Sequence, residues 1–484
     1  MNLPGILILN GNKTYGRNKK NKLLYKLIPN DNTLQNYLVP YEIKNLGFCK
    51  NLENLYVIFT LDPEPKLIEV IGSVLSNINF YEYQLFCHGL KQSLTIFKNK
   101  VIDNLKLYLD PIEEINKKYN LESRIDDSWY IFSIDPEGSR DIDDAFSIKI
   151  LENNNYLISI YIANVPVWLD FLELNDDIVS ISTIYLPNRK QPMLPNILSD
   201  DKCSLLENNN RIAFTLDLEI DNFGKIITYN FLNTLVNLKK NWSYDDPKLL
   251  LNKNYIMLIE IVKKMNNEKN IDSHKLVEIL MIKMNCICGK ILFENKLGIF
   301  RKVAFEPNLD IPNIIPKNIA NTIQIIHNAE SSYCKSLNLD PIKHDILQLD
   351  SYIHITSPIR RVVDIINMSF IQKIYGLVNF SDKINNFLDK MYQDNKIDEI
   401  NILSKKIRSL QNKCNLLNTI SLNYEDTILE GYVINDKTFY IPEYKLQCKL
   451  PQDKEYIIYS KYNCKLYLFN DNDKLTKKIR VEFF

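Results

Sequence analysis

The stretch SIDPEGSRDIDDAFS, residues 133–147, crowds four aspartates into ten positions. They are Asp135, Asp141, Asp143 and Asp144, and within the stretch only Arg140 carries a positive charge. Carboxylates this close together repel one another unless a cation or hydrogen bonds compensate them. The segment therefore predicts a partner, which either the rest of the chain or a bound cation has to supply.

The residues after the turn predict a strand, because Ile142, Phe146 and Ile148 alternate along DIDDAFSIKI. This alternation places Asp144 on the apolar face, which is unfavourable for an unpaired charge. We expect Mg²⁺ or Mn²⁺ there, since oxygen ligands suit these ions and two-metal phosphoryl chemistry uses such clusters. A calcium loop is excluded, because Ala145 and Phe146 occupy positions that need a polar ligand and a glycine. A solvated acidic hairpin stays an open alternative.

A second segment, SYIHITSPIRRVVDIINMSFIQKIYG, predicts a helix with Ser357 as its N-cap residue and a proline in its first turn. Arg360 and Arg361 then lie in that first turn, where the helix dipole disfavours cations. Two arginines at this place indicate an anion-binding site. Two alternatives stay open, namely solvated arginines and a pair between Arg361 and Asp364.

Both segments, in this order and at this separation, resemble the RNB catalytic domain of the ribonuclease II and ribonuclease R exoribonucleases. Further similar stretches are YIANVPVWL, STIYLPNRKQPMLPNILSDDKCSL, NWSYDD and SHKLVEILMIKMN, so the resemblance covers about residues 124–380. It implies processive 3′-to-5′ hydrolysis of single-stranded RNA to nucleoside 5′-monophosphates, with Mg²⁺ or Mn²⁺ in a two-metal mechanism.

The resemblance also implies a role for each residue of the two segments. Three aspartates would hold metal: Asp135, Asp141 and Asp144. Asp143 would position or activate the attacking water. Arg360 would bind the scissile phosphate and stabilise the charge that develops on it.

Substrate contacts are expected from four further residues: Tyr185, Arg361, Ser357 and Tyr352. Tyr185 corresponds to an aromatic residue that stacks on bases near the 3′ end, and such stacking contributes about 1–3 kcal/mol per base. A tyrosine that only packs beside a turn stays an alternative. His354 is expected to be structural, because a lone histidine between two isoleucines is more often a packed residue.

The chain departs from the family pattern at several positions. Asn164 replaces an acid in YIANV, Asn367 and Met368 replace a His-Arg pair, and Glu278 is followed by isoleucine where a second acid is usual. The stretch between NWSYDD and SHKLVEI also lacks the segment that supplies the second aromatic residue of the base clamp. We expect these changes to alter processivity or product length before they abolish the chemistry.

The 484 residues are 45% apolar and 24% charged, as in ordinary globular proteins. We expect the α+β class, with a central RNB catalytic domain flanked by small all-β barrels of the cold-shock or OB type. The expected boundaries are 1–105 for the N-terminal β region, 106–128 for a linker helix, 129–420 for the catalytic domain and 421–484 for the C-terminal β domain. FYEYQLF is expected to be a strand and NTIQIIHNAESSYCKSL a helix.

Basic and acidic residues balance at 59 each, so any site for a polyanion has to be local. No stretch reaches the roughly 18 apolar residues that a membrane span needs, and scattered cysteines indicate a reducing compartment. We therefore expect a soluble, cytoplasmic monomer that binds single-stranded RNA, and the short flanking barrels suggest a protein partner that delivers it. Two alternatives to an exonuclease remain: an RNB-fold RNA-binding or scaffold protein, and a phosphodiesterase acting on DNA or small nucleotides.

Overall fold

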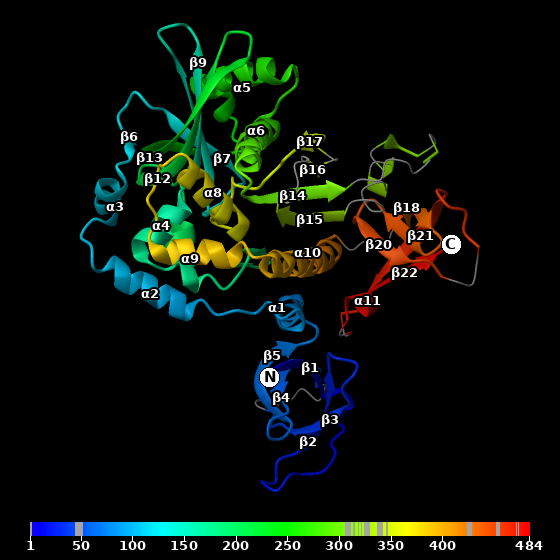
Figure 1. The fold of residues 1–484 in the computed structure, drawn as a ribbon. Helices are drawn as coiled ribbons and strands as arrows, with labels where there is room; N and C mark the ends of the chain where they lie inside the picture. The colour runs from blue at the N-terminus through cyan, green and yellow to red at the C-terminus, as the bar shows by residue number, and fades with distance from the viewer. Residues whose placement is uncertain are drawn as a thin grey trace.

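The described residues of the computed structural model form five β-sheets, which helices connect (Figure 1). It describes residues 2–43, 52–304, 311–312, 315–317, 319–320, 322–323, 330–335, 342–344, 347–423, 428–451, 455–470, 472 and 474–484. The α+β class predicted from the sequence is confirmed, whereas the domain boundaries stay a prediction. Within the described ranges no helix is long and apolar enough to cross a membrane.

The N-terminal sheet is antiparallel, and its strand order is β3-β2-β1-β4-β5. Its strands are β1 (Leu3–Ile8), β2 (Leu24–Pro29), β3 (Tyr37–Pro40), β4 (Leu55–Thr60) and β5 (Lys66–Ser73). The edge strands β3 and β5 also contact each other, so the sheet curves towards a small barrel. A hydrophobic core of its own lies inside it, which includes Leu7, Tyr25 and Phe59.

The strand predicted for residues 80–86 is wrong, because this stretch belongs to helix α1 (Asn77–Cys87). The side chain of Ser76 caps the helix by accepting a hydrogen bond from Asn79 N. Phe80, Tyr83 and Gln84 are buried at helical spacing. The spacing of the aromatic residues fits both a strand and a helix. The N-cap at Ser76 and the tertiary contacts therefore decide in favour of the helix.

The central sheet has the order β12-β9-β8-β7-β13-β6, and β12 also pairs with β13. Its strands are β6 (Glu122–Arg124), β7 (Ile131–Asp135), β8 (Asp144–Ile150), β9 (Tyr156–Ala163), β12 (Asn210–Ile220) and β13 (Ile226–Ser243). The long β13 pairs with β12 along its first part and with β7 along its last part. Strands β7, β8, β9, β12 and β13 therefore close into a ring, called the central barrel below.

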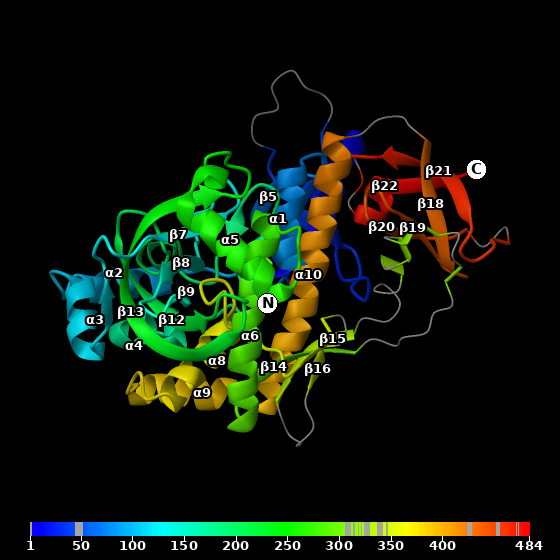
Figure 2. The same ribbon diagram turned by 90° about the horizontal axis from the view of Figure 1, so that it is seen from above.

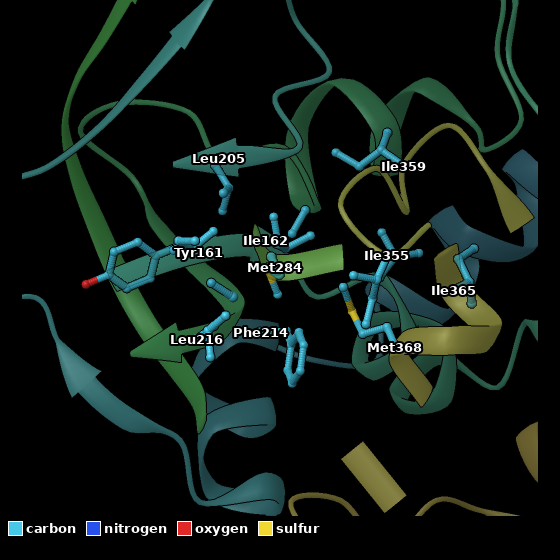
Figure 3. Close-up of a cluster of buried hydrophobic side chains, with 14 of the residues drawn as sticks. Tyr161, Ile162, Leu205, Phe214, Leu216, Met284, Ile355, Ile359, Ile365 and Met368 are labelled. Atoms are coloured by element: carbon cyan, nitrogen blue, oxygen red, sulfur yellow. The ribbon is translucent and has the colours of Figure 1, made fainter. Parts of the chain in front are cut away.

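Helices cover the central barrel and contribute residues to its hydrophobic core. They are α2 (Thr95–Leu105), α3 (Pro111–Tyr119), α4 (Val165–Leu172), α5 (Lys253–Asn266), α6 (Ser273–Glu294), α8 (Val362–Ile374) and α9 (Asp382–Met391). Figure 3 shows Ile162 of β9 and Phe214 of β12 facing Met284 of α6, and Ile355 and Met368 nearby. The core beneath the sheet thus fixes α6 and α8, the two helices nearest the acidic residues.

A four-stranded sheet beside α6 has the order β15-β14-β16-β17. Its strands are β14 (Ile299–Ala304), β15 (Glu330–Lys335), β16 (Lys343–His344) and β17 (Leu349–Asp350). The helix predicted for NTIQIIHNAESSYCKSL is wrong at residues 330–335, which pair with β14. Most other positions of that prediction, His327 among them, lie outside the described residues.

The C-terminal sheet repeats the strand order of the N-terminal one, as β20-β19-β18-β21-β22. Its elements are β18 (Ile428–Asn435), β19 (Thr438–Ile441), β20 (Leu446–Lys449), β21 (Lys461–Leu468), α11 (Leu475–Lys478) and β22 (Ile479–Phe483). Helix α10 (Asp394–Leu422) lies between this sheet and the central barrel in both views (Figure 2). Its second half shares one hydrophobic cluster with α1 and both outer sheets.

Candidate active site

The acidic residues lie where β7 turns into β8. β7 ends at Asp135 and β8 begins at Asp144. Phe132 pairs with Phe146 across the two strands, which fixes the register of the turn. β13 holds the turn from the other side, because Tyr244 N donates to the carbonyl oxygen of Asp135 at 3.1 Å. The strand pairing therefore brings both ends of the acidic segment to one edge of the central barrel.

No salt bridge between described residues compensates Asp135 or Asp144. Burial raises the pKa of Asp135 to about 6, and the charge of Asp141 contributes to the rise. Burial also raises the pKa of Asp144 well above its usual range, and the charges of Asp135 and Asp143 raise it further. Oδ2 of Asp135 is buried without a hydrogen-bond partner in the described part of the chain. Two neighbouring half-buried carboxylates of this kind are the arrangement that a bound cation stabilises.

Asp143 is only 4% exposed and faces the segment before α8. Its Oδ1 accepts a hydrogen bond from Ile359 N at 2.9 Å, and its Oδ2 accepts one from Nε of Arg360 at 3.2 Å. Burial raises its pKa to about 7, although the charge of Arg360 and the bond from Ile359 lower it. A carboxyl group with a pKa near neutrality is well suited to accept a proton and return it.

The helix predicted to begin at Ser357 begins later, so that prediction is wrong. α8 starts at Val362, and Arg361 before it is extended. The residues between them form a turn, in which the backbone nitrogens of Arg360 and Arg361 both donate to Ser357 O. The two arginines therefore precede the helix instead of lying in its first turn.

The physical reason is that carboxylates of the chain itself take the free backbone donors. Asp143 accepts from Ile359 N, and Asp364 accepts from Ser357 N at 2.8 Å. Asp143, which lies 216 residues before Ile359 in the sequence, is thus an anion that the chain itself places here, and phosphate binding by Arg360 stays a prediction. Ser357 also orients the catalytic candidate Arg360, because its hydroxyl accepts from Nη2 of the guanidinium at 3.0 Å.

Arg361 forms the pair with Asp364 that was one of the open alternatives. Its Nη2 lies 2.8 Å from Oδ1 of Asp364, which is fully buried. Nε of Arg361 and Oδ2 of Asp364 are buried without hydrogen-bond partners among the described residues. The guanidinium also lines the cavity described below. A direct contact of Arg361 with substrate stays a prediction.

A hairpin of β10 (Ile184–Tyr185) and β11 (Lys190–Gln191) reaches the acidic residues from a third side. It is fixed to the arginine segment by a hydrogen bond from Thr183 N to Arg360 O at 3.0 Å. The Tyr185 hydroxyl donates to Oδ2 of Asp141 at 2.8 Å, and Nζ of Lys190 lies 2.9 Å from Oδ1. Tyr185 is 36% exposed, so its ring stays accessible.

The segment with Tyr352 and His354 crosses α6 at Gly289. A Cβ there would overlap the carbonyl oxygen of Ser351, so only glycine permits this approach. Asn285 of α6 holds the segment by donating to the Tyr352 hydroxyl at 3.0 Å. Burial lowers the pKa of His354 well below its usual range, and the nearby charge of Arg361 lowers it further. Nδ1 of His354 lies 2.8 Å from the hydroxyl of Tyr333, so the ring is held by packing and a hydrogen bond, which fits the structural role expected from the sequence.

One cavity of about 570 Å³ is lined by every residue predicted for the site. These are Asp135, Asp141, Asp143, Asp144, Tyr185, Tyr352, Ser357, Arg360 and Arg361. Sequence reasoning missed Tyr244 and Asn285, which also line the cavity, although both lie in stretches that carry the family resemblance. It named Glu278 only as a departure, and missed Lys190 because nothing in the local sequence indicates a contact with Asp141.

Comparison with known proteins identifies the family. The RNB domain model matches residues 124–257 and 248–376, which is more than half of the chain and contains the whole cavity lining. The chain belongs to the RNB-domain family. Among RNB proteins, ribonuclease R of Aquifex aeolicus is 27% identical over 220 residues, which cover 43% of this chain and 30% of that protein. The matched part thus spans about a third of that relative's length.

Solved structures of two other proteins share the fold. Ribonuclease R of Mycoplasma genitalium, in complex with ribose-methylated single-stranded RNA, has a TM-score of 0.72 at 17% identity and covers 100% of this chain and 90% of its own. Yeast Ssd1, a pseudonuclease, has a TM-score of 0.61 at 13% identity and covers 96% of this chain and 67% of its own. The RNB fold therefore occurs both with and without nuclease activity.

Two departures from the RNB pattern lie outside the cavity lining. Asn164 is fully buried and caps α4 by accepting from Val167 N. Its side-chain amide also bonds those of Asn233 and Gln372, at 2.8 and 3.1 Å. Asn367 is likewise buried, and its Oδ1 accepts from the backbone that begins β14. Both amides have complete structural roles, so neither change removes a group from the cavity.

The donors of this RNB site fit a hard divalent ion in their chemistry. Oδ2 of Asp135, which has no hydrogen-bond partner among the described residues, and the raised pKa of Asp144 both suit a hard cation as a partner. No three His, Cys, Asp or Glu side chains in the described ranges already stand in a ligand arrangement. Asp141, the third predicted ligand, faces Tyr185 and Lys190 instead. That Asp135, Asp141 and Asp144 hold a metal ion stays a prediction.

Proposed function

We propose that this RNB chain is a 3′-to-5′ exoribonuclease that hydrolyses single-stranded RNA to nucleoside 5′-monophosphates with Mg²⁺ or Mn²⁺. The observation that carries the proposal is the single cavity that gathers every predicted site residue from three distant stretches of the chain. A homologue named ribonuclease R and the solved ribonuclease R complex with single-stranded RNA support the substrate class.

Each residue has a part that follows from its contacts. The side chain of Arg360 is 46% exposed, and its guanidinium would bind a non-bridging oxygen of the scissile phosphate. Ser357 and Asp143 orient it through Nη2 and Nε. Asp143 would also take the proton of the attacking water, since its raised pKa of about 7 makes it a base near neutral pH.

The ring of Tyr185 would stack on a base near the 3′ end, because its hydroxyl holds it at the cavity while the side chain is 36% exposed. Asp135 and Asp144, with Asp141 once it is free, would hold the metal. A divalent ion bound there would offset the charge of the phosphate and promote ionisation of water. A cytoplasmic location, a monomeric state and a protein partner that delivers RNA stay predictions.

The test is incubation of the purified chain and Mg²⁺ with a 5′-labelled single-stranded RNA and, separately, with DNA of the same sequence. We expect the RNA to shorten towards a small 5′-labelled fragment and the DNA to stay intact. Asp143→Asn should abolish shortening, because an amide cannot accept the proton. Intact RNA under these conditions, or equal loss of RNA by the variant, would refute the proposal.

A second candidate function is an RNA-binding or scaffold protein without turnover. It is favoured by the likeness to the pseudonuclease Ssd1 over 96% of this chain and by the engagement of Asp141 with Lys190 instead of a ligand set. A native gel with the same labelled RNA separates the two functions. RNA that is shifted in mobility yet remains full length with Mg²⁺ or Mn²⁺ would favour the scaffold.

A further inference from the structure

Lys190 places a cation of the chain itself at the acidic edge of the central barrel. Its Nζ lies 2.9 Å from Oδ1 of Asp141 and 2.8 Å from Oδ1 of Asp200. Asp200 is held in turn by the hydroxyl of Ser199, at 2.6 Å. The side chains of Lys190, Asp141 and Asp200 are 22%, 14% and 15% exposed, so this bridge is largely shielded from water.

The four aspartates at the acidic edge form two pairs, one with salt bridges to the chain and one without them in the described residues. Asp143 has the guanidinium of Arg360, and Asp141 has the ammonium of Lys190. For Asp135 and Asp144 no salt bridge is found within the described chain. Of the four aspartates at the acidic edge, Asp141 and Asp143 thus have a cationic side chain of the protein as a partner, and Asp135 and Asp144 are left for a bound ion.

We propose that Lys190 is a tethered cation that competes with a metal ion for Asp141. This inference rests on the proposed metal site and goes beyond it by naming what controls occupancy. While Lys190 holds Asp141, only Asp135 and Asp144 would be available to hold a divalent ion. When Lys190 swings fully to Asp200, Asp141 becomes free to act as a ligand. A lysine suits this part, because its ammonium is a compact charge on a flexible stem.

The contacts of Lys190 with Asp141 and Asp200 predict that replacing Lys190 and replacing Asp200 have opposite effects on metal binding. Removal of the Lys190 charge frees Asp141, so metal should bind more tightly or in a second position. Neutralisation of Asp200 leaves Asp141 as the only acid that Lys190 contacts, so metal should bind more weakly. A purely structural ion pair would give no such opposition, since loss of either partner would act through stability alone.

The experiment measures Mn²⁺ binding to the full-length chain without RNA, from the electron paramagnetic resonance signal of free Mn²⁺. We expect about one ion per wild-type chain. In Lys190→Met we expect a second ion or a Kd several-fold lower, and in Asp200→Asn a Kd several-fold higher. The matched control is Lys202→Met, which removes a lysine that pairs with Asp201 at 3.4 Å and does not line the cavity; it should bind like wild type.

Thermal unfolding in EDTA checks that each variant folds, and Lys190→Gln is the substitute if Lys190→Met does not. Equal Mn²⁺ stoichiometry and Kd in wild type, Lys190→Met and Asp200→Asn would overturn the role of Lys190. That result would leave the nuclease proposal intact if the wild type still shortens RNA. Altered Mn²⁺ binding with RNA that stays intact would instead support Lys190 and refute the nuclease.

Discussion

Two groups of buried charges lie on the central barrel and differ in how far the chain satisfies them. Arg124 is 2% exposed and donates to both carboxylate oxygens of Asp217, at 2.9 and 2.6 Å. It also donates to Ser159 and Tyr161, and the Trp129 ring lies 4.2 Å from its guanidinium carbon. Its charge is therefore neutralised and hydrogen-bonded on all sides.

The acidic edge with Asp135 and Asp144 is the opposite case. Both carboxyl groups have raised pKa values because they are buried and close to other acids. A completed network of buried charges holds a fold together, whereas an incomplete one costs stability and persists where a ligand completes it. The comparison thus separates the residues that hold the central barrel from the two aspartates that we propose as metal ligands.

The largest effect is expected from Asp144→Asn, which should separate function from stability. Loss of a metal ligand removes several kcal/mol of transition-state stabilisation, which is about 10³-fold in rate or more. In EDTA the same change should raise the melting temperature, because it removes one of two repelling buried charges. Single-turnover degradation of labelled RNA and thermal unfolding measure the two. A variant that retains a tenth of the rate, or melts lower in EDTA, would contradict this.

Asp217→Asn should have the opposite effects, because it should lower the stability of the fold and leave the rate of RNA degradation nearly unchanged. It leaves Arg124 with Glu122, 2.8 Å from its Nη2, as its remaining carboxylate partner. The loss of the second carboxylate should lower the free energy of unfolding by about 1–3 kcal/mol. The rate of RNA degradation per folded molecule should stay within about two-fold of wild type, since Asp217 does not line the cavity. Urea unfolding provides the measurement. Glu173→Gln is the control, because its pair with Lys383 is exposed and such pairs contribute about 0–1 kcal/mol.

The pH dependence of the metal-free protein should show the strain of the acidic edge. Asp143, with a pKa of about 7, and Asp135, with a pKa of about 6, bind protons more tightly in the folded state than in the unfolded state. The free energy of unfolding should therefore fall as pH rises from about 4 to about 7, by roughly 2–4 kcal/mol for Asp143 alone.

The depressed pKa of His354 acts in the other direction, because a buried neutral histidine adds stability as pH rises. The difference in urea stability between wild type and Asp143→Asn, both in EDTA at pH 5 and 7.5, isolates the aspartate. Excess Mg²⁺ should reduce the slope, since an ion favours the charged carboxylates. A difference that does not change with pH would show that Asp143 is ionised throughout.

The local structure around the site could be predicted from the sequence where it depends on neighbouring residues. It could not be predicted where it depends on residues far away in the chain. The strand at residues 144–150 follows from the alternation of apolar residues along DIDDAFSIKI. The start of α8 does not, because Asp143 takes the donor of Ile359 from 216 positions away. The contact of Lys190 with Asp141 could not be predicted for the same reason, because it depends on how the β10–β11 hairpin packs against the acidic residues.

The smallest effect is expected from Tyr185→Phe, which tests which part of this residue matters. The change removes the hydroxyl bond to Asp141 and keeps the ring, so KM for RNA should change by only a few-fold. Tyr185→Ala removes the ring as well, and at about 1–3 kcal/mol per stacked base KM should rise about 5- to 150-fold. Equal losses in the two variants would mean that the hydroxyl matters more than the ring. Tyr185 would then be, like Lys190, a residue that positions Asp141. The base would have to stack elsewhere in the cavity, where Tyr244 is an aromatic residue of the lining.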